Sequence, residues 1–307
     1  MKQLIFIFIV LIAVSARAQK PEFAQTLLMP THHFSALAGY HGAVQTNLQY
    51  RNQWPGIPFN YVTYALNVDG YIPGIKSGLG VIAMHDRDVS GLVQTNQVIL
   101  NYSKWFEVNE NLKIISGLTG SFQQVAIDWS QLTFPPHPTP IPLPYQSTPI
   151  EAPANGYMLG ASAGIINGHR LLVYQFAYSS KPDFYEGADP VVFAYHDLYL
   201  SQRLFVEYKF NLIPSVNYRK YGEFNSITFA MNGQIGGFNL GLAYRWQDAI
   251  LTQLGFEFNK RFLISYSYDV TVSPLSTQTL GSHELGIRLS LNTKNKKDVL
   301  IENLQLL

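Results

Sequence analysis

The segment 265–291, near the end of the chain, constrains the fold most strongly. From position 284 onward, apolar and polar residues alternate strictly: Leu285, Ile287, Leu289 and Leu291 on one side, Glu284, Gly286, Arg288 and Ser290 on the other. Successive side chains of a strand point to opposite faces, so one face of this strand is apolar and the other polar. The pattern recurs along most of the chain, and no segment is left over to cover the apolar faces. We therefore predict a membrane-spanning β-barrel with lipid outside and a polar lumen inside.

The composition agrees with a barrel and excludes several other classes of protein. Charged residues make up 13% of the 307 residues, about half the share usual in soluble proteins. Tyrosine and phenylalanine number 19 each, which suits strands and interfacial aromatic belts. The net charge of +1 does not favour nucleic acid as a partner. Because the chain has no cysteine, disulfides, thiol catalysis and cysteine-based zinc sites are excluded.

The first residues have the organisation of an export signal. Lys2 supplies a positive start, residues 4–14 are apolar, and Ala16-Arg17-Ala18 matches the small-x-small cleavage pattern. We expect cleavage between Ala18 and Gln19. An uncleaved anchor is the alternative, but the apolar run is too short to span a bilayer comfortably. The residue after the cut is not cysteine, which argues against a lipoprotein.

Fourteen strands are expected across the mature chain. They are placed near residues 42–50, 60–70, 76–86, 93–106, 111–126, 155–166, 169–179, 195–204, 206–219, 224–234, 237–246, 250–259, 261–271 and 280–292. We therefore predict a closed antiparallel transmembrane β-barrel of about 14 strands. The expected organisation is a signal peptide over 1–18, a periplasmic segment over 19–41, a barrel over 42–292 and a periplasmic tail over 293–307. The apolar content of residues 19–40 leaves two places open for that segment, the lumen or the periplasmic mouth.

The connections between the strands indicate the orientation of the barrel. Gaps after even-numbered strands are short, whereas those after odd-numbered strands tend to be longer, with short exceptions near 220–223 and 247–249. Outer-membrane barrels have short periplasmic turns and long extracellular loops. The longest gap, 127–154, includes a proline-rich run that proline excludes from a strand ladder. We consider it either a variable surface loop or a partner-binding loop, with Trp129, Phe134, Pro135, Pro136, Pro138, Pro140, Pro142, Pro144 and Tyr145 as candidate contacts.

Motifs that indicate catalysis or metal binding in other proteins lack their usual structural context in this sequence. Residues 160–164 match the G-x-S-x-G string of serine hydrolases around Ser162, but the string lies inside a strand and no helix follows. His32, His33 and His41 lack a further spaced ligand nearby, so we predict no metal site. We also expect no cofactor. Four inward carboxylates are expected to pair with Arg245, Lys209 or Arg288 across the lumen; they are Glu207, Glu257, Asp269 and Glu284.

Several short strings together resemble the PorP/SprF family of outer-membrane proteins, associated with type IX secretion in Bacteroidetes. The most specific are Tyr50-Arg51-Asn52-Gln53-Trp54-Pro55-Gly56 near the start and Tyr266-Ser267-Tyr268-Asp269 with Gly281-Ser282-His283-Glu284 at the end. Others are Gly78-Leu79-Gly80, Ile213-Pro214-Ser215-Val216 and Gly241-Leu242-Ala243-Tyr244-Arg245 with Asp248-Ala249. The family's early Asn-Pro-Ala-x-x-Gly is replaced by Phe34-Ser35-Ala36-Leu37-Ala38-Gly39.

The resemblance implies a non-enzymatic barrel that works with secretion and gliding machinery and serves a large cognate surface protein or adhesin. The matching residues are expected to be mainly structural; they are Arg51, Trp54, Tyr244, Arg245, Asp248, Tyr266, Tyr268, Asp269, His283 and Glu284. Expected partners are outer-membrane lipid, the cognate surface protein and the periplasmic type IX secretion machinery. The alternatives are a transporter barrel for small hydrophobic molecules and an outer-membrane hydrolase or acyltransferase.

Overall fold

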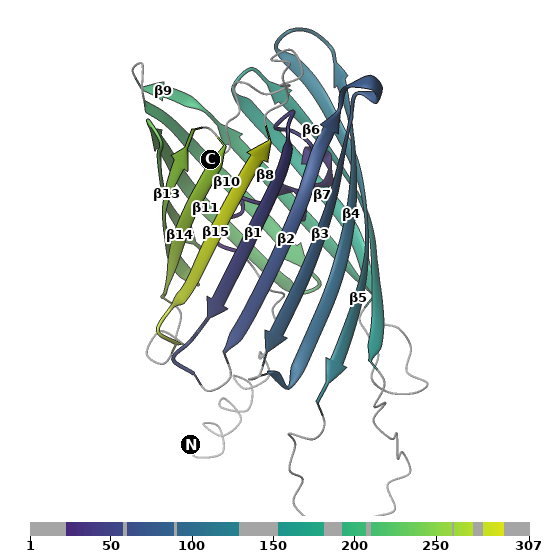
Figure 1. Ribbon diagram of the computed structural model, residues 1–307, viewed down its shortest axis with the longest axis vertical. Helices are drawn as coiled ribbons and strands as arrows, with labels where there is room; N and C mark the ends of the chain where they lie inside the picture. Colours follow the sequence, from purple (N-terminus) through teal and green to yellow (C-terminus); the bar gives the residue numbers. More distant parts are fainter. Residues whose placement is uncertain are drawn as a thin grey trace, which may run out of the picture.

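The computed structural model describes residues 23–57, 60–88, 91–128, 153–180, 192–206, 210–259, 261–272 and 279–291. Almost all of them lie in antiparallel strands (Figure 1). The strands are β1 (Val44–Gln53), β2 (Tyr61–Ile72), β3 (Ser77–Asp88), β4 (Val93–Glu107), β5 (Leu112–Ile127), β6 (Ala154–Asn167), β7 (Arg170–Ser180), β8 (Val192–Gln202), β9 (Leu204–Val206), β10 (Phe210–Tyr221), β11 (Phe224–Ile235), β12 (Phe238–Arg245), β13 (Ala249–Phe258), β14 (Phe262–Thr271) and β15 (Ser282–Leu291).

The strands close into one antiparallel barrel. Consecutive strands pair with each other, except that β8 pairs with β10 and not with β9. The ring closes because β1 pairs with both β2 and β15, and β10 pairs with β11. The three-residue β9 pairs only with the first residues of β10, beside β8, so the wall has fourteen strands. Closure leaves no free sheet edge, which is what a strand structure requires inside a bilayer. The predicted fold class and strand number are confirmed.

Two strand boundaries differ from the prediction, the end of β1 and the start of β10. β1 continues to Gln53 instead of ending at residue 50, because its last residues pair with both β15 and β2. Arg51 therefore belongs to the barrel wall. The strand predicted over 206–219 begins at Phe210, and Val206 lies in β9.

The alternation read from the sequence separates the two surfaces of the wall. On β15, Leu285 and Leu289 are 44% and 43% exposed on the outside, while Glu284 and Arg288 are 1% and 5% exposed on the lumen side. Outward leucine, isoleucine, valine and tyrosine side chains recur on the other strands. Buried glutamine, asparagine, serine and charged side chains occupy many of the inward positions, and apolar side chains such as Ile82, Ile115 and Val173 occupy others. This arrangement is that of a barrel with lipid outside and polar groups inside.

Residues 23–43 lie inside the barrel and are called the lumen segment (Figure 1). They include two short 3-10 helices, η2 (Pro30–His32) and η3 (Ser35–Leu37). Leu28, Phe34 and Tyr40 are at most 1% exposed. Apolar side chains of the lumen segment form two clusters with inward residues of the wall. Phe34 and Tyr40 lie in a cluster with Trp105, Ile115 and Tyr199. Phe23 and Met29 lie in a second cluster with Ala65, Ile82 and Ile99. The lumen thus contains an apolar core supplied partly by the chain's own N-terminal part.

No helix in the described part of the chain is long and apolar enough to cross a membrane. Residues 1–22 and 292–307, which include the expected signal peptide and nearly all of the expected tail, lie outside the described residues.

Candidate functional site

An ionic cluster beside the junction of the first and last strands, β1 and β15, holds the start of the lumen segment. Arg51 on β1 donates to Asp269 on β14 (Nη2 to Oδ2, 2.8 Å) and to Glu284 on β15 (Nη1 to Oε2, 3.2 Å). The Glu284 carboxylate also accepts the backbone N–H groups of Ala24 at 2.7 Å and Gln25 at 3.0 Å. These wall side chains are at most 3% exposed, so the charges are paired out of contact with bulk water. The cluster joins β1, β14, β15 and the lumen segment at one point.

The prediction of the charge partners was partly wrong. Asp269 and Glu284 pair with Arg51, which was not among the expected partners, because β1 lies beside β15 and puts Arg51 directly opposite Glu284. Arg288 does pair with Glu257, at 3.8 Å. Arg245 pairs with Asp248 in the following turn, at 2.9 Å. Glu207 and Lys209 lie outside the described residues.

Two further carboxylates hold the rest of the lumen segment. Asp197 on β8 lies 3.3 Å from His33 Nδ1 and accepts from Arg219 Nε at 2.9 Å. Asp69 on β2 accepts the backbone N–H of Gly39 at 2.8 Å. With Glu284 these groups form three acidic anchors, at the beginning, middle and end of the segment. Burial lowers the pKa of the nearby His41 well below its usual value, and the charge of Arg288 adds to this effect.

Neutral side chains of the wall bind the peptide groups of the lumen segment directly. The hydroxyl of Ser162 accepts from the Ala36 N–H at 2.6 Å, and the Gln175 amide oxygen accepts from the Ser35 N–H at 3.1 Å. Asn101 donates to the Thr31 carbonyl at 2.8 Å, and Ser103 donates to the Ala38 carbonyl at 2.7 Å. Together these contacts satisfy backbone groups that no ladder pairs inside the lumen.

Two inward glycines allow the lumen segment to lie directly against the wall. A Cβ at Gly78 on β3 would overlap the carbonyl of Ala38, and a Cβ at Gly117 on β5 would overlap the backbone of Ser35 and Ala36. The contacts are with backbone atoms, which cannot rotate away as a side chain can. The sheet therefore approaches the segment more closely at these positions than any other residue would permit.

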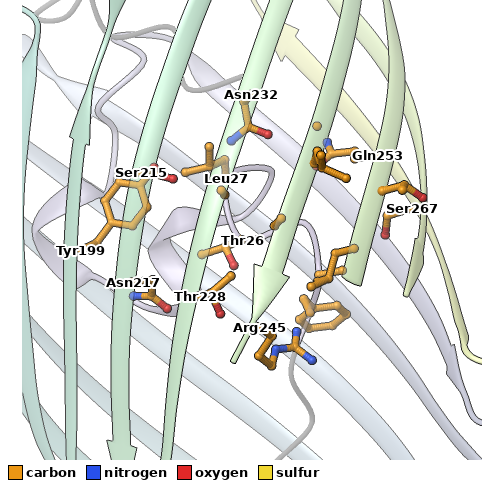
Figure 2. A pocket seen from close by; sticks show the side chains of 18 residues that line it. Thr26, Leu27, Tyr199, Ser215, Asn217, Thr228, Asn232, Arg245, Gln253 and Ser267 are labelled. Atoms are coloured by element: carbon orange, nitrogen blue, oxygen red, sulfur yellow. The ribbon is translucent and has the colours of Figure 1, made fainter. Parts of the chain in front are cut away.

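A cavity with a mixed polar and apolar lining remains on the other side of the lumen segment. It lies between Thr26 and Leu27 of the segment and the inward faces of β10 to β14 (Figure 2). Its empty volume is about 640 Å3 with its open mouth included. Labelled side chains around it are Tyr199, Ser215, Asn217, Thr228, Asn232, Arg245, Gln253 and Ser267.

The remaining family-matching residues lie near the same end of the wall. Tyr266 and Tyr268 on β14 face outward and contact His283 on β15, with Tyr266 Oη 2.7 Å from His283 Nδ1. Tyr244 on β12 also faces outward, 39% exposed. Trp54 follows β1 with φ of +59°, and its N–H donates to the carbonyl of Gly281 at 3.0 Å. The two strings from the start and the end of the chain, residues 50–56 and residues 266–269 with 281–284, are thus brought together where β1, β14 and β15 meet.

Residues considered for catalysis or metal binding have other contacts. Ser162 lies within β6 and binds Ala36 and Ser35, so its hydroxyl serves the lumen segment. His32 packs against Phe23, with ring centroids 5.8 Å apart, and His41 packs against Tyr40 at 3.6 Å. Within the residues that the structure describes, no group of three or more histidine, aspartate or glutamate side chains could hold a metal ion.

A family model for "Type IX secretion system membrane protein PorP/SprF" matches residues 16–289. The chain belongs to the PorP/SprF family. The match covers the lumen segment and the barrel up to Leu289, near the end of β15. The protein is thus an outer-membrane β-barrel of a family associated with type IX secretion, as its resemblance implied. A comparison with curated protein sequences finds no match.

Solved structures similar to this PorP/SprF barrel are other outer-membrane barrels. The toluene transporter TbuX of Ralstonia pickettii is 8% identical with a TM-score of 0.51; the alignment covers 86% of this chain and 94% of TbuX. The CymD monoaromatic hydrocarbon channel is 11% identical with a TM-score of 0.50, covering 89% and 94%. The KdgM porin is 11% identical with a TM-score of 0.42, covering 81% and 99%. At these identities the likeness concerns the fold alone.

The residues that bind the PorP/SprF lumen segment were largely missed by the sequence analysis. They are Gln49, Asp69, Asn101, Ser103, Gln175 and Asp197. Their signal is present in the sequence, because each is a polar residue at an inward position of its strand. Nothing in a strand pattern distinguishes a polar group that faces water from one that faces a peptide. The proline-rich candidates, Trp129 and residues 134–145, lie outside the described residues.

Proposed function

We propose that this barrel is a non-enzymatic receptor and anchor, which holds a cognate secreted surface protein at the outer membrane and contacts the type IX secretion machinery. Membership of the PorP/SprF family supports the association with secretion. The observation that most favours an anchor is the lumen segment, which three buried carboxylates and several hydrogen bonds hold inside the barrel. An occupied lumen is less suited to conducting solutes than an open one.

Export would precede this role. We propose that residues 1–18 are removed as a signal peptide, so that Gln19 becomes the first residue and the lumen segment follows it closely. Mass spectrometry of the protein purified from outer membranes is expected to find an N-terminal peptide that begins at Gln19. A peptide that begins at Met1 would reject the cleavage.

The ends of the barrel supply the proposed contacts. The long connections after β5 and β7 are proposed to face the cell exterior and to bind the surface protein, since outer-membrane barrels carry their long loops there. The short turns at the other end and the tail 293–307 would face the secretion machinery. A proline-rich segment loses little conformational entropy when it binds, because it is already extended. The connection that contains residues 134–149 is thus the preferred docking element.

Deleting residues 134–149 is expected to release the surface protein while the barrel still folds. The proline-rich run is absent from every described strand, so its removal leaves the wall ladder intact. Surface display can be measured by antibody labelling of whole cells, and folding by the heat-dependent mobility of the barrel on gels. A matched control replaces the same residues with a glycine and serine linker of equal length. Display that survives both changes would count against the loop as a docking element.

Transport of small hydrophobic molecules is the second candidate. It is favoured by the fold likeness to TbuX and CymD, whose names describe a toluene transporter and a monoaromatic hydrocarbon channel. It is opposed by the polar inward faces, such as Gln45, Asn47 and Gln49 on β1, each at most 4% exposed. Toluene uptake by liposomes that contain the barrel is expected to match that of empty liposomes. Uptake above this level would favour the transporter.

A hydrolase remains a third, weaker candidate. Its serine would be Ser162, whose hydroxyl already bonds with the lumen segment. A labelled active-site probe for serine hydrolases is expected to leave the protein unmodified, and covalent labelling of Ser162 would support an enzyme.

A further inference from the structure

The lumen segment covers only part of the inner wall. Its anchors and backbone contacts come from β1, β2, β4, β6, β7, β8 and β15. The cavity lies on the remaining side, where β10 to β14 face Thr26 and Leu27 (Figure 2). The barrel therefore encloses one filled half and one open half. The proposed anchor function does not involve the open half.

The filled half shows which ligand this type of wall binds. There the hydroxyls of Ser103 and Ser162 and the amides of Asn101 and Gln175 bind backbone N–H and carbonyl groups of a peptide. Hydroxyl and primary amide groups act both as donors and as acceptors, as a peptide group does. Neutral side chains on an inward face can thus recognise a polypeptide without reading its sequence.

The open half carries the same residue types. Ser215, Asn232, Gln253 and Ser267 line the cavity, while Gly241 and Ala243 leave room beside them. The Ser267 hydroxyl and the Gln253 Nε2 are buried and have no hydrogen-bond partner within the described part of the chain. Ser267 is only 1% exposed. Because a buried polar group is unfavourable unless it is hydrogen-bonded, these groups point to a ligand with donors and acceptors of its own.

The charges of the cavity narrow the class of ligand. None of the described residues that line it carries a carboxylate, and the only charged side chain there is Arg245, which pairs with Asp248 at 2.9 Å. A strongly cationic ligand has no counter-charge in such a site. An uncharged, extended stretch of polypeptide meets this condition, because it brings donors and acceptors along its backbone and no charge.

We propose that this cavity binds an extended, uncharged segment of the surface protein, which lies beside Thr26 and Leu27 of the lumen segment. The proposal rests on the anchor function above and adds a site within the lumen to the contacts of the loops. The inserted segment would bond with Ser267, Gln253 and Asn232 as the lumen segment bonds with Ser162, Gln175 and Asn101. The lumen would thus hold two segments, one from each protein.

The first test uses the absence of cysteine from the chain. Ala243→Cys places a single thiol on the cavity wall, at a half-exposed inward position of β12. A small water-soluble maleimide is added to outer-membrane fragments from cells with and without the surface protein whose display depends on the barrel. We expect labelling without that protein and protection with it. Glu110→Cys, in the exposed turn before β5, is the control and should be labelled equally in both.

The second test fills the cavity. Ala243→Phe is expected to abolish display of the surface protein, whereas Leu240→Phe should preserve it. Leu240 lies on the outer face of the same strand, is 49% exposed and does not line the cavity. Heat-dependent gel mobility shows whether each variant is folded. Two results together overturn the inference: the Ala243→Phe barrel folds and still displays the surface protein, and the thiol of Ala243→Cys stays reactive when the surface protein is present. In that case the cavity holds water only.

These outcomes are separable from failure of the anchor function itself. If removal of the whole barrel leaves every surface protein in place, the anchor function falls and the cavity inference falls with it. If removal of the barrel or of residues 134–149 abolishes display but neither change at Ala243 has an effect, the anchor stands and only the lumen site is rejected.

Discussion

Replacing Arg51 with methionine will destabilise the folded barrel by about 3–5 kcal/mol, the usual effect of removing one partner from a buried ion pair. The change leaves two buried carboxylates, Asp269 and Glu284, without their shared cation. It also weakens the anchor on Ala24 and Gln25, because both of their N–H groups donate to Glu284. The free energy of unfolding can be measured by denaturant titration of the barrel refolded in lipid vesicles.

Two matched variants separate the buried charge from a general effect of losing an arginine. Arg170→Met removes an exposed arginine from β7 and is expected to have little effect. The triple change Arg51→Met, Asp269→Asn and Glu284→Gln should recover much of the lost stability, since neutral amides need no counter-charge. If Arg51→Met unfolds at the same denaturant concentration as Arg170→Met, the cluster does not stabilise the barrel in the way argued here.

Alanine at Gly78 and Gly117 together will expel the lumen segment and open the barrel. Each new methyl group would overlap backbone atoms of the segment at residues 35–38, whereas the extended backbone of the two strands is sterically open to alanine. The wall should therefore remain folded while the segment leaves its position. We expect a large rise in ion conductance across planar bilayers and rapid protease cleavage within residues 23–43.

Gly120→Ala is the control for this experiment. Gly120 lies on β5 as Gly117 does, but a Cβ there would contact only the side chain of Leu159, at an ordinary 3.6 Å. Its conductance and protease resistance should equal those of the parent. A double variant that is folded, closed and resistant to protease would mean that close approach at these glycines does not hold the segment in place.

The wall of the barrel could be predicted from the sequence because its two surfaces face different media. Leu285 and Leu289 face outward while Glu284 and Arg288 face the lumen, so a period of two residues appears directly in the chain. The strand number follows from counting such segments. The end of β1 was placed too early because Arg51, Asn52 and Gln53 are all polar, and only their pairing with β15 and β2 shows that the strand continues.

The candidate site could not be predicted to the same degree. The residues that contact the lumen segment are spread over β1 to β8, β14 and β15, and which strand lies beside which residue of the segment depends on the closed barrel. Asp197 and His33, for example, are brought together only because β8 passes beside η2 and η3. The pairing of Arg51 with Glu284 depends on the register of the first and last strands, which alternation alone does not specify.

The clasp between Glu284 and residues 24–25 has a consequence for biogenesis. It joins positions about 260 apart in sequence, so residues 24–25 cannot be bound at this point until the last strand, β15, is in place. Arg51 and Glu284 also face each other across the joint between the first and last strands. Completion of the cylinder and locking of its interior are therefore a single event, and a barrel stalled before that event would present its N-terminal end unfastened to the quality-control proteases of the envelope.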